Sequence, residues 1–256
     1  MPGPETRPAL LILGGTTEGA ELARVLHRQY AGRLRIVSSL AGRVERPGPL
    51  PGEVRIGGFG GPVGLAQYMR ENGITMLVDA THPFATAISA HARQACDILR
   101  LPRLTLERPA WQRQPGDIWV EVDDMEEAAR LLPRIGQRAF LTVGTGEIEP
   151  FAKSEGVWFL VRLIAPPKTP LPLEDYQVTL GRGPFSIDDE RSLLSSWQID
   201  CVVTKASGGF ATYGKIIAAR ELRLPVLMIR RPDPEPGERV SSIDGALGWV
   251  RQMAGM

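Results

Sequence analysis

The chain has 256 residues, of which 43% are hydrophobic and 23% charged, which is typical of a folded protein of one large or two small domains. Its 30 basic and 29 acidic residues leave a net charge of +1, which argues against a general nucleic-acid binder. No apolar run approaches the ~20 residues that span a bilayer, and the start of the chain lacks the basic stretch of a secretory signal, so no membrane partner is expected.

The first half alternates short apolar runs with amphipathic segments. Strands are predicted at 10–13, 34–37, 53–56, 76–78 and 104–106. Helices are predicted at 65–72 and in the two segments where apolar residues within 22–30 and 84–99 have helical spacing. We expect Gly73 to end the second helix and Thr81 to cap the third, with Pro83 in its first turn. Strands that alternate with helices predict a parallel sheet, and right-handed crossovers make it doubly wound.

The pattern breaks at 108–116, which we interpret as the crossing into a second domain. Strands follow at 119–122, 139–143, 157–163, 177–180, 201–204 and 226–229, with helices at 125–132, 187–196, 210–222 and 243–254, the last capped by Ser242. The predicted fold class is α/β, with two Rossmann-like domains, each a mainly parallel sheet flanked by helices. The predicted boundaries are 1–112 and 113–256.

A glycine-rich turn joins the first strand to the first helix. It consists of Gly14, Gly15, Thr16, Thr17, Glu18 and Gly19. Backbone N–H groups and the partial positive charge of a helix N-terminus favour phosphate there, and the two threonines would add hydroxyl donors. The spacing departs from G-x-G-x-x-G, so a structural turn is the alternative, but the position in the first βαβ unit favours a nucleotide.

The second strand is followed by Ser38, Ser39 and Arg43, where a site for NAD usually has Asp or Glu. Hydroxyls and a cation suit a 2′-phosphate, so a dinucleotide bound here is predicted to be NADP rather than NAD. For Arg43 taken alone, a solvated loop arginine is the alternative.

The fourth strand ends beside the first, at the predicted switch point where open α/β sheets bind ligands. The candidate cofactor contacts there are Asp79, Ala80, Thr81 and Pro83. His82 could hydrogen-bond a ligand or donate a proton. The alternative is that this segment only caps a helix.

Three glycine turns in the second half offer further backbone donors to anions. The candidate ligand residues in and near them are Gly144, Thr145, Arg182, Lys205, Ser207, Gly208, Gly209, Tyr213 and Lys215. Any one turn could be ordinary turn chemistry, but three in one domain suit a large ligand with several carboxylates.

Neither a covalent nucleophile nor a bound metal is indicated. Cys96 and Cys201 lie far apart, which excludes a disulfide framework and favours a reducing, cytoplasmic setting. The three histidines are too scattered for a zinc site, and neither a G-x-S-x-G elbow nor a Walker A lysine is present. We therefore expect the chemistry to come from a bound cofactor.

The sequence contains, in order, ILGGTTEG, VSSLAGR, LVDATHPFA, VTKASGG, YGKIIAAREL and PVLMIRRP. Together these segments resemble the precorrin-6A reductase family of cobalamin biosynthesis, with Ala206 departing from the polar or acidic residue expected at its position. The resemblance implies NADPH-dependent reduction of a tetrapyrrole ring double bond, precorrin-6A to precorrin-6B, in a cleft between two Rossmann-like domains. Members use either a metal-free or a cobalt-containing precorrin, and the neighbouring pathway enzymes are candidate partners.

Carried over by motif, the first turn would hold the pyrophosphate, and Ser38, Ser39 and Arg43 would meet the ribose phosphate. The segment 79–83 would lie near the nicotinamide, and the turns of the second half would hold the acetate and propionate groups of the substrate. Lys205 is the first candidate for proton delivery and His82 the second, and a water molecule is a third.

Two other functions fit the same first half. An NADP-dependent oxidoreductase acting on a smaller substrate would need fewer anion sites in the second half. A non-catalytic NADP-binding sensor would bind NADPH without oxidising it.

Overall fold

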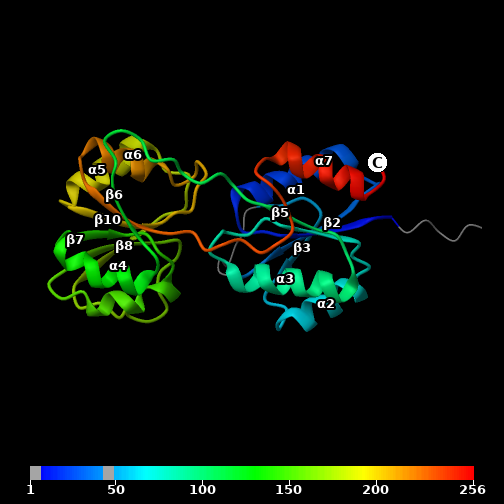
Figure 1. The fold of residues 1–256 in the computed structure, drawn as a ribbon, viewed down its shortest axis with the longest axis horizontal. Coiled ribbons are helices and arrows are strands. Elements are labelled where there is room, and N and C mark those ends of the chain that lie inside the picture. Colours follow the sequence, from blue (N-terminus) through cyan, green and yellow to red (C-terminus); the bar gives the residue numbers. More distant parts are fainter. Residues whose placement is uncertain (1–6, 43–48) are drawn as a thin grey trace, which may run out of the picture. The chain divides into compact units, whose positions relative to one another are not determined.

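The computed structural model describes residues 7–42 and 49–256, so the predicted contact Arg43 lies outside the described residues. The chain folds into two compact units, each with a six-stranded parallel sheet flanked by helices (Figure 1). The first unit runs to Arg108 and resumes at Pro232, and the second is Pro109–Arg231. The predicted fold class is therefore confirmed.

The sheet of the first unit has the order β12-β5-β4-β1-β2-β3. Its elements are β1 (Ala9–Leu13), α1 (Thr17–Tyr30), β2 (Arg35–Leu40), β3 (Glu53–Ile56), α2 (Pro62–Glu71), β4 (Met76–Asp79), α3 (Thr86–Leu99), β5 (Arg103–Leu106), β12 (Glu238–Val240) and α7 (Ile243–Met253). Successive strand residues point to opposite faces, so Leu10 packs with α1 and α7 while Leu11 packs with α2 and α3. Burial on both faces explains why β1 is an unbroken apolar run.

The sheet of the second unit has the order β6-β11-β10-β7-β8-β9. Its elements are β6 (Ile118–Val122), α4 (Met125–Leu131), η1 (Leu132–Arg134), β7 (Arg138–Leu141), η2 (Thr145–Glu147), η3 (Glu149–Lys153), β8 (Trp158–Leu163), β9 (Tyr176–Leu180), α5 (Ile187–Ser196), β10 (Cys201–Lys205), α6 (Gly214–Glu221) and β11 (Pro225–Ile229). Phe140 and Val202 pack against α5 and α6 on one face, and Figure 1 shows α4 on the other.

The end of the chain belongs to the first unit, which corrects the predicted second domain of 113–256. β12 pairs in parallel with β5, and Ile243 and Leu247 of α7 pack against the core beneath α1. The first sheet thus takes its sixth strand, β12, from the chain that follows the second unit, whereas the six strands of the second sheet, β6–β11, come from one continuous stretch. The sequence did not indicate that the chain returns to the first unit, because β12 has only three residues and two of them are exposed and charged.

Three of the element boundaries that differ from the predicted ones affect candidate site residues. β2 continues to Leu40 instead of ending at Val37, so Ser38 and Ser39 lie inside a strand. α3 begins at Thr86, because the side chain of Thr81 bonds to Asp79 and does not cap the helix. α6 begins at Gly214 rather than near 210, after a loop in which two glycines have positive φ.

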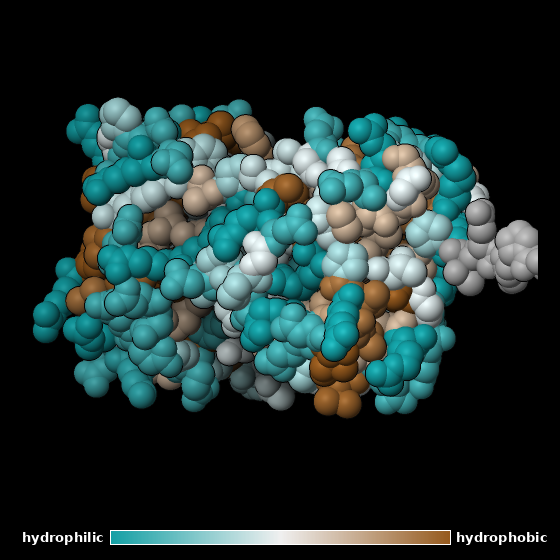
Figure 2. Space-filling model, turned by 45° about the vertical axis from the view of Figure 1, so that its right-hand side comes forward, coloured by the Kyte–Doolittle hydropathy of each residue, from teal (hydrophilic) through white to brown (hydrophobic). Residues whose placement is uncertain are grey.

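On the face drawn in Figure 2, hydrophilic residues cover most of the surface, and hydrophobic residues gather in separate patches. In the first unit, the exposed side chains of Val63 on α2 and Ile98 on α3 line one groove. Within the described part of the chain, no helix combines the length and the apolar character needed to cross a membrane.

Candidate functional site

Each sheet changes its winding direction between two central strands. In the first unit these are β1 and β4, and in the second they are β7 and β10. The carboxyl edge at such a point is where open α/β sheets bind ligands, because the loops leaving the two strands diverge there. The glycine turn and the 79–83 segment follow β1 and β4, and the GTG and KASGG turns follow β7 and β10.

The turn after β1 is shaped by Thr16 and two glycines. The Thr16 hydroxyl caps α1 by accepting from the Gly19 N–H at 3.1 Å, and it donates to the Ala80 carbonyl at 2.7 Å. Gly15 has φ +108°, and a Cβ on it would meet no atom within 4 Å, so the space above it is open. Thr16 therefore ties the end of β1 to the end of β4 and has no hydroxyl hydrogen left for a ligand.

Gly14 and Glu18 also have partners within the chain, Gly14 through a hydrogen bond and Glu18 through an ion pair. The Gly14 N–H donates to the Ser39 carbonyl at 2.9 Å, so the donors this turn can offer come from the next residues and the first turn of α1. The Glu18 carboxylate lies 3.8 Å from the Arg108 guanidinium. The sequence analysis missed Arg108, whose positive charge balances the negative charge of Glu18 beside the turn proposed to bind phosphate.

The two serines of β2 do not form a single hydroxyl cluster. Ser38 and Ser39 are both buried, and consecutive residues of a strand point to opposite faces of the sheet. One ligand group can therefore meet at most one of these hydroxyls. The Ser38 Oγ is buried without a hydrogen-bond partner among the described residues.

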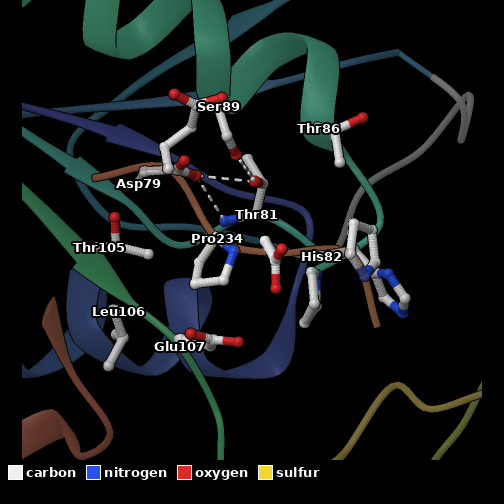
Figure 3. Close-up of a pocket in the computed structure, with 13 residues that line it drawn as sticks. Asp79, Thr81, His82, Thr86, Ser89, Thr105, Leu106, Glu107 and Pro234 are labelled. Carbon is white, nitrogen blue, oxygen red and sulfur yellow. Dashed lines mark hydrogen bonds between the residues drawn. The ribbon is translucent and has the colours of Figure 1, made fainter. Parts of the chain in front are cut away.

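A pocket opens at the carboxyl ends of β4 and β5 (Figure 3). It has a volume of about 40 Å³, and its lining includes Asp79, Thr81, His82, Thr86, Ser89, Thr105, Glu107 and the segment 232–235. The His82 Nδ1 accepts from the Phe84 N–H at 3.3 Å. A lining with this many acidic and hydroxyl groups suits a ligand group that donates hydrogen bonds.

Asp79 is the buried acid of this pocket and is only 2% exposed. Its Oδ1 accepts from the Thr81 N–H at 3.1 Å and from the Thr81 hydroxyl at 2.7 Å. Its Oδ2 is buried and has no hydrogen-bond partner among the described residues. A buried carboxylate oxygen left unpaired is costly, so it is a natural acceptor for a ligand N–H or O–H.

In the second unit, Lys205 and the GTG turn meet at one carboxylate. The Lys205 Nζ lies 2.6 Å from the Glu147 Oε2, and the same oxygen accepts from the Gly144 N–H at 2.9 Å. These two donors therefore already bind a carboxylate within the chain. The sequence analysis missed Glu147, although its position three residues after Gly144 is that of a capping-box glutamate.

The KASGG loop is held rigidly from behind. Arg231 donates to the Ser207 carbonyl at 3.0 Å, and the Trp111 indole donates to the Gly209 carbonyl at 2.6 Å. Gly208 has φ +70°, and a Cβ on it would lie 2.2 Å from the Pro109 carbonyl oxygen, so only glycine fits there.

Tyr213 and Lys215 support this loop from inside. The Tyr213 ring packs against Trp111 at 5.7 Å, and its hydroxyl accepts from Arg220 at 3.2 Å. Lys215 is 4% exposed, and its ammonium donates to the Thr212 carbonyl at 3.0 Å. The structure thus gives both residues packing contacts behind the loop, and their predicted contact with the ligand stays a prediction.

Arg182 is exposed in the turn after β9, at the carboxyl edge of the same sheet. β9 is two strands from β7, which corresponds to about 10 Å. Arg182 and the turn at Gly144 are therefore spaced for separate groups of one large ligand.

These features define an α/β protein of two doubly wound Rossmann-like units, each with polar groups gathered at its central crossover. The chain belongs to the precorrin-6x reductase CbiJ/CobK family, which matches residues 9–251. The resemblance drawn from the sequence motifs is thereby confirmed.

Relatives match over nearly the full chain. The precorrin-6A reductase of Rhodococcus erythropolis is 46% identical over 94% of this chain and 96% of its own length. That of a Sinorhizobium species is 45% identical, over 95% and 93%. A solved structure of CobK precorrin-6A reductase superposes with a TM-score of 0.91 at 39% identity, covering 96% of this chain and 97% of its own.

Proposed function

We propose that the chain is an NADPH-dependent reductase that converts precorrin-6A to precorrin-6B. The observation that carries this proposal is the first unit's crossover, where an open glycine turn lies beside the Asp79 pocket, in a member of the precorrin-6x reductase family. The named activity of the full-length relatives supports it.

The residues of the first unit fit a dinucleotide. The open space above Gly15 and the N-terminus of α1 suit the pyrophosphate. The unpaired Asp79 Oδ2 suits a hydrogen-bond donor, such as the carboxamide of nicotinamide or a ribose hydroxyl. When bound, NADPH supplies the hydride. Asp79 and Thr81 would hold its reactive end, and Arg43 would favour the 2′-phosphate.

The second unit fits a substrate with several carboxylates. The exposed Arg182 stands at the carboxyl edge of its sheet, at the same edge as the Gly144 N–H and Lys205, which bind the carboxylate of Glu147 within the chain. Thr145 and Gly208 would add further donors around this edge, whereas the N–H groups of Ser207 and Gly209 donate to the carbonyls of Lys205 and Pro109. These groups would orient the macrocycle, and orientation alone can be worth about 7–11 kcal/mol of the barrier.

Reduction of the ring double bond also requires a proton at the neighbouring carbon. Lys205 is our first candidate for the donor, because its ammonium is held at the carboxyl edge by Glu147. His82 is the second candidate, because it lines the pocket of the first unit.

The test is turnover of precorrin-6A by the purified chain with NADPH or NADH, followed by loss of nicotinamide absorbance and by the mass of the product. We expect a gain of two hydrogens and a preference for NADPH that weakens in Arg43→Ala. Oxidation of NADPH by small carbonyl compounds but not by precorrin-6A would favour the smaller-substrate oxidoreductase. NADPH binding without oxidation would favour a sensor.

A further inference from the structure

One aromatic side chain stands out in solvent at the carboxyl edge of the second unit. Phe210 is 93% exposed, whereas Val63, the next most exposed large hydrophobic residue among those the structure describes, is 71% exposed. Burying a phenylalanine ring stabilises a protein by about 1.5–3 kcal/mol. The exposed Phe210 ring does not contribute this stabilisation, so packing within the chain does not explain why a phenylalanine stands there.

The exposure does not come from a slack loop. On one side of Phe210, the Gly209 N–H donates to the Pro109 carbonyl at 3.2 Å, and the Gly209 carbonyl accepts from Trp111 at 2.6 Å. On the other side, the Phe210 carbonyl accepts from the Tyr213 N–H at 3.1 Å. The backbone is therefore fixed on both sides of a ring that points away from the core.

The ring follows β10, directly after the KASGG loop described above. Lys205 ends β10 beside Glu147, and Ser207, Gly208 and Gly209 lead into Phe210. An apolar ring at a sheet edge that also carries the cations Lys205 and Arg182 fits a ligand with a broad apolar body and acidic side chains.

We infer that Phe210 is a substrate-contact residue whose ring packs against the face of the tetrapyrrole macrocycle while the neighbouring turns hold its carboxylates. This inference rests on the proposed function and names the residue that recognises the ring itself. It separates two parts of recognition: Phe210 binds the apolar body, and the turns bind the acids.

The test compares Phe210→Ala and Phe210→Trp with the unaltered chain. The probe is uroporphyrin, a stable tetrapyrrole with acetate and propionate groups, and the readout is its Kd by absorbance titration. Phe210→Ala should weaken binding on the order of tenfold, about 1.4 kcal/mol, and raise the KM for precorrin-6A with the KM for NADPH unchanged. Phe210→Trp should bind as the unaltered chain does.

The matched control is Ile118→Ala, which removes an exposed apolar side chain at the first residue of β6, on the amino edge of the same sheet. It should leave the Kd unchanged. The Tm of Phe210→Ala should also stay unchanged, because its ring is almost fully solvated. If Phe210→Ala and the unaltered chain have equal Kd values, the role of Phe210 is wrong but the proposed function stands. If the unaltered chain neither binds nor reduces a tetrapyrrole, both the role of Phe210 and the proposed function are wrong.

Discussion

The Lys205 ammonium and the Glu147 carboxylate lie 2.6 Å apart, and Glu147 also accepts a hydrogen bond from the Gly144 N–H. The pair joins the loops that leave β10 and β7, the two strands between which the winding of the second sheet reverses. Glu147 therefore fixes the position of the cation that we propose as the proton donor.

Replacing Lys205 by alanine should lower kcat at saturating NADPH by about 10²–10⁴-fold, which is the range for loss of a general acid. The Kd for NADPH should not change, because the cofactor is proposed to bind the first unit. Steady-state kinetics with precorrin-6A and a separate NADPH titration measure the two effects. The control is Lys153→Ala, an exposed lysine of the same unit. An unchanged kcat would remove Lys205 from the mechanism.

Replacing Glu147 by glutamine should have a smaller effect, on the order of tenfold in kcat. The amide oxygen can still accept from the Gly144 N–H, so the turn is kept, but Lys205 loses the charge that holds it. The neighbouring exposed acid gives the control, Glu149→Gln, with the same change in net charge. If Glu147→Gln and Glu149→Gln had the same kcat, Glu147 would have no positioning role.

Asp79→Asn tests the pocket of the first unit. The asparagine oxygen can replace Oδ1 and accept from Thr81, but an NH₂ group then stands where the unpaired Oδ2 was, and it cannot accept from a ligand. We expect the Kd for NADPH to rise on the order of tenfold, which corresponds to about 1.4 kcal/mol and lies near the lower end of the roughly 1.5–3 kcal/mol of a hydrogen bond to a charged group.

Nicotinamide fluorescence on binding measures this Kd. Asp97→Asn provides the comparison, because it removes the same charge from a solvated position on α3. Equal NADPH affinity in Asp79→Asn and the unaltered chain would mean that Asp79 only shapes the turn through Thr81.

The central strands could be predicted from the sequence because they are buried on both faces. β1, β4, β7 and β10 consist almost wholly of buried residues, so each reads as an apolar run. β12 could not be predicted in this way, because Glu238 and Arg239 are exposed and the strand is defined by its pairing with β5. For this reason the sequence analysis assigned the end of the chain, which belongs to the first unit, to the second domain.

For the candidate site, the glycine turns were visible but their internal partners were not. Hydrogen bonds between residues far apart in the sequence, such as that from Thr16 to Ala80, decide which donors remain for a ligand. The supporting positions of Tyr213 and Lys215 depend on Trp111, which lies about a hundred residues earlier in the chain. The pattern of residue types along the sequence does not indicate which distant residues pair in this way.

Both cysteines should be unreactive in the folded protein. Burial raises the pKa of the Cys96 thiol to about 12 and that of Cys201 to about 12, whereas an exposed cysteine has a pKa of about 8.5. A disulfide reagent at pH 8 should therefore titrate no thiol in the native chain and two after unfolding. Reaction of either thiol in the native state would contradict its burial.

The same pKa shifts predict an alkaline loss of stability. The unfolded chain can ionise both thiols above about pH 8.5, but the folded chain keeps them neutral up to about pH 12. The contribution of these thiols to the free energy of unfolding is thus complete below about pH 8.5 and decreases as the pH rises toward 12. Cys96→Ala/Cys201→Ala should show a weaker decrease over this range in denaturant titrations.

Two glycine-to-alanine substitutions should shift stability in opposite directions. At Gly208 the φ of +70° and the Pro109 carbonyl oxygen, 2.2 Å from the added Cβ, make alanine strained, so we expect a loss of about 1–3 kcal/mol and weaker tetrapyrrole binding. At Gly248, inside α7, an added Cβ meets no atom within 4 Å, and alanine should stabilise the helix by about 0.5–1 kcal/mol. Urea unfolding of the two variants measures both effects. If Gly208→Ala were as stable as the unaltered chain, the loop could move away from Pro109. Our inference that the loop holds Phe210 rigidly would then be wrong.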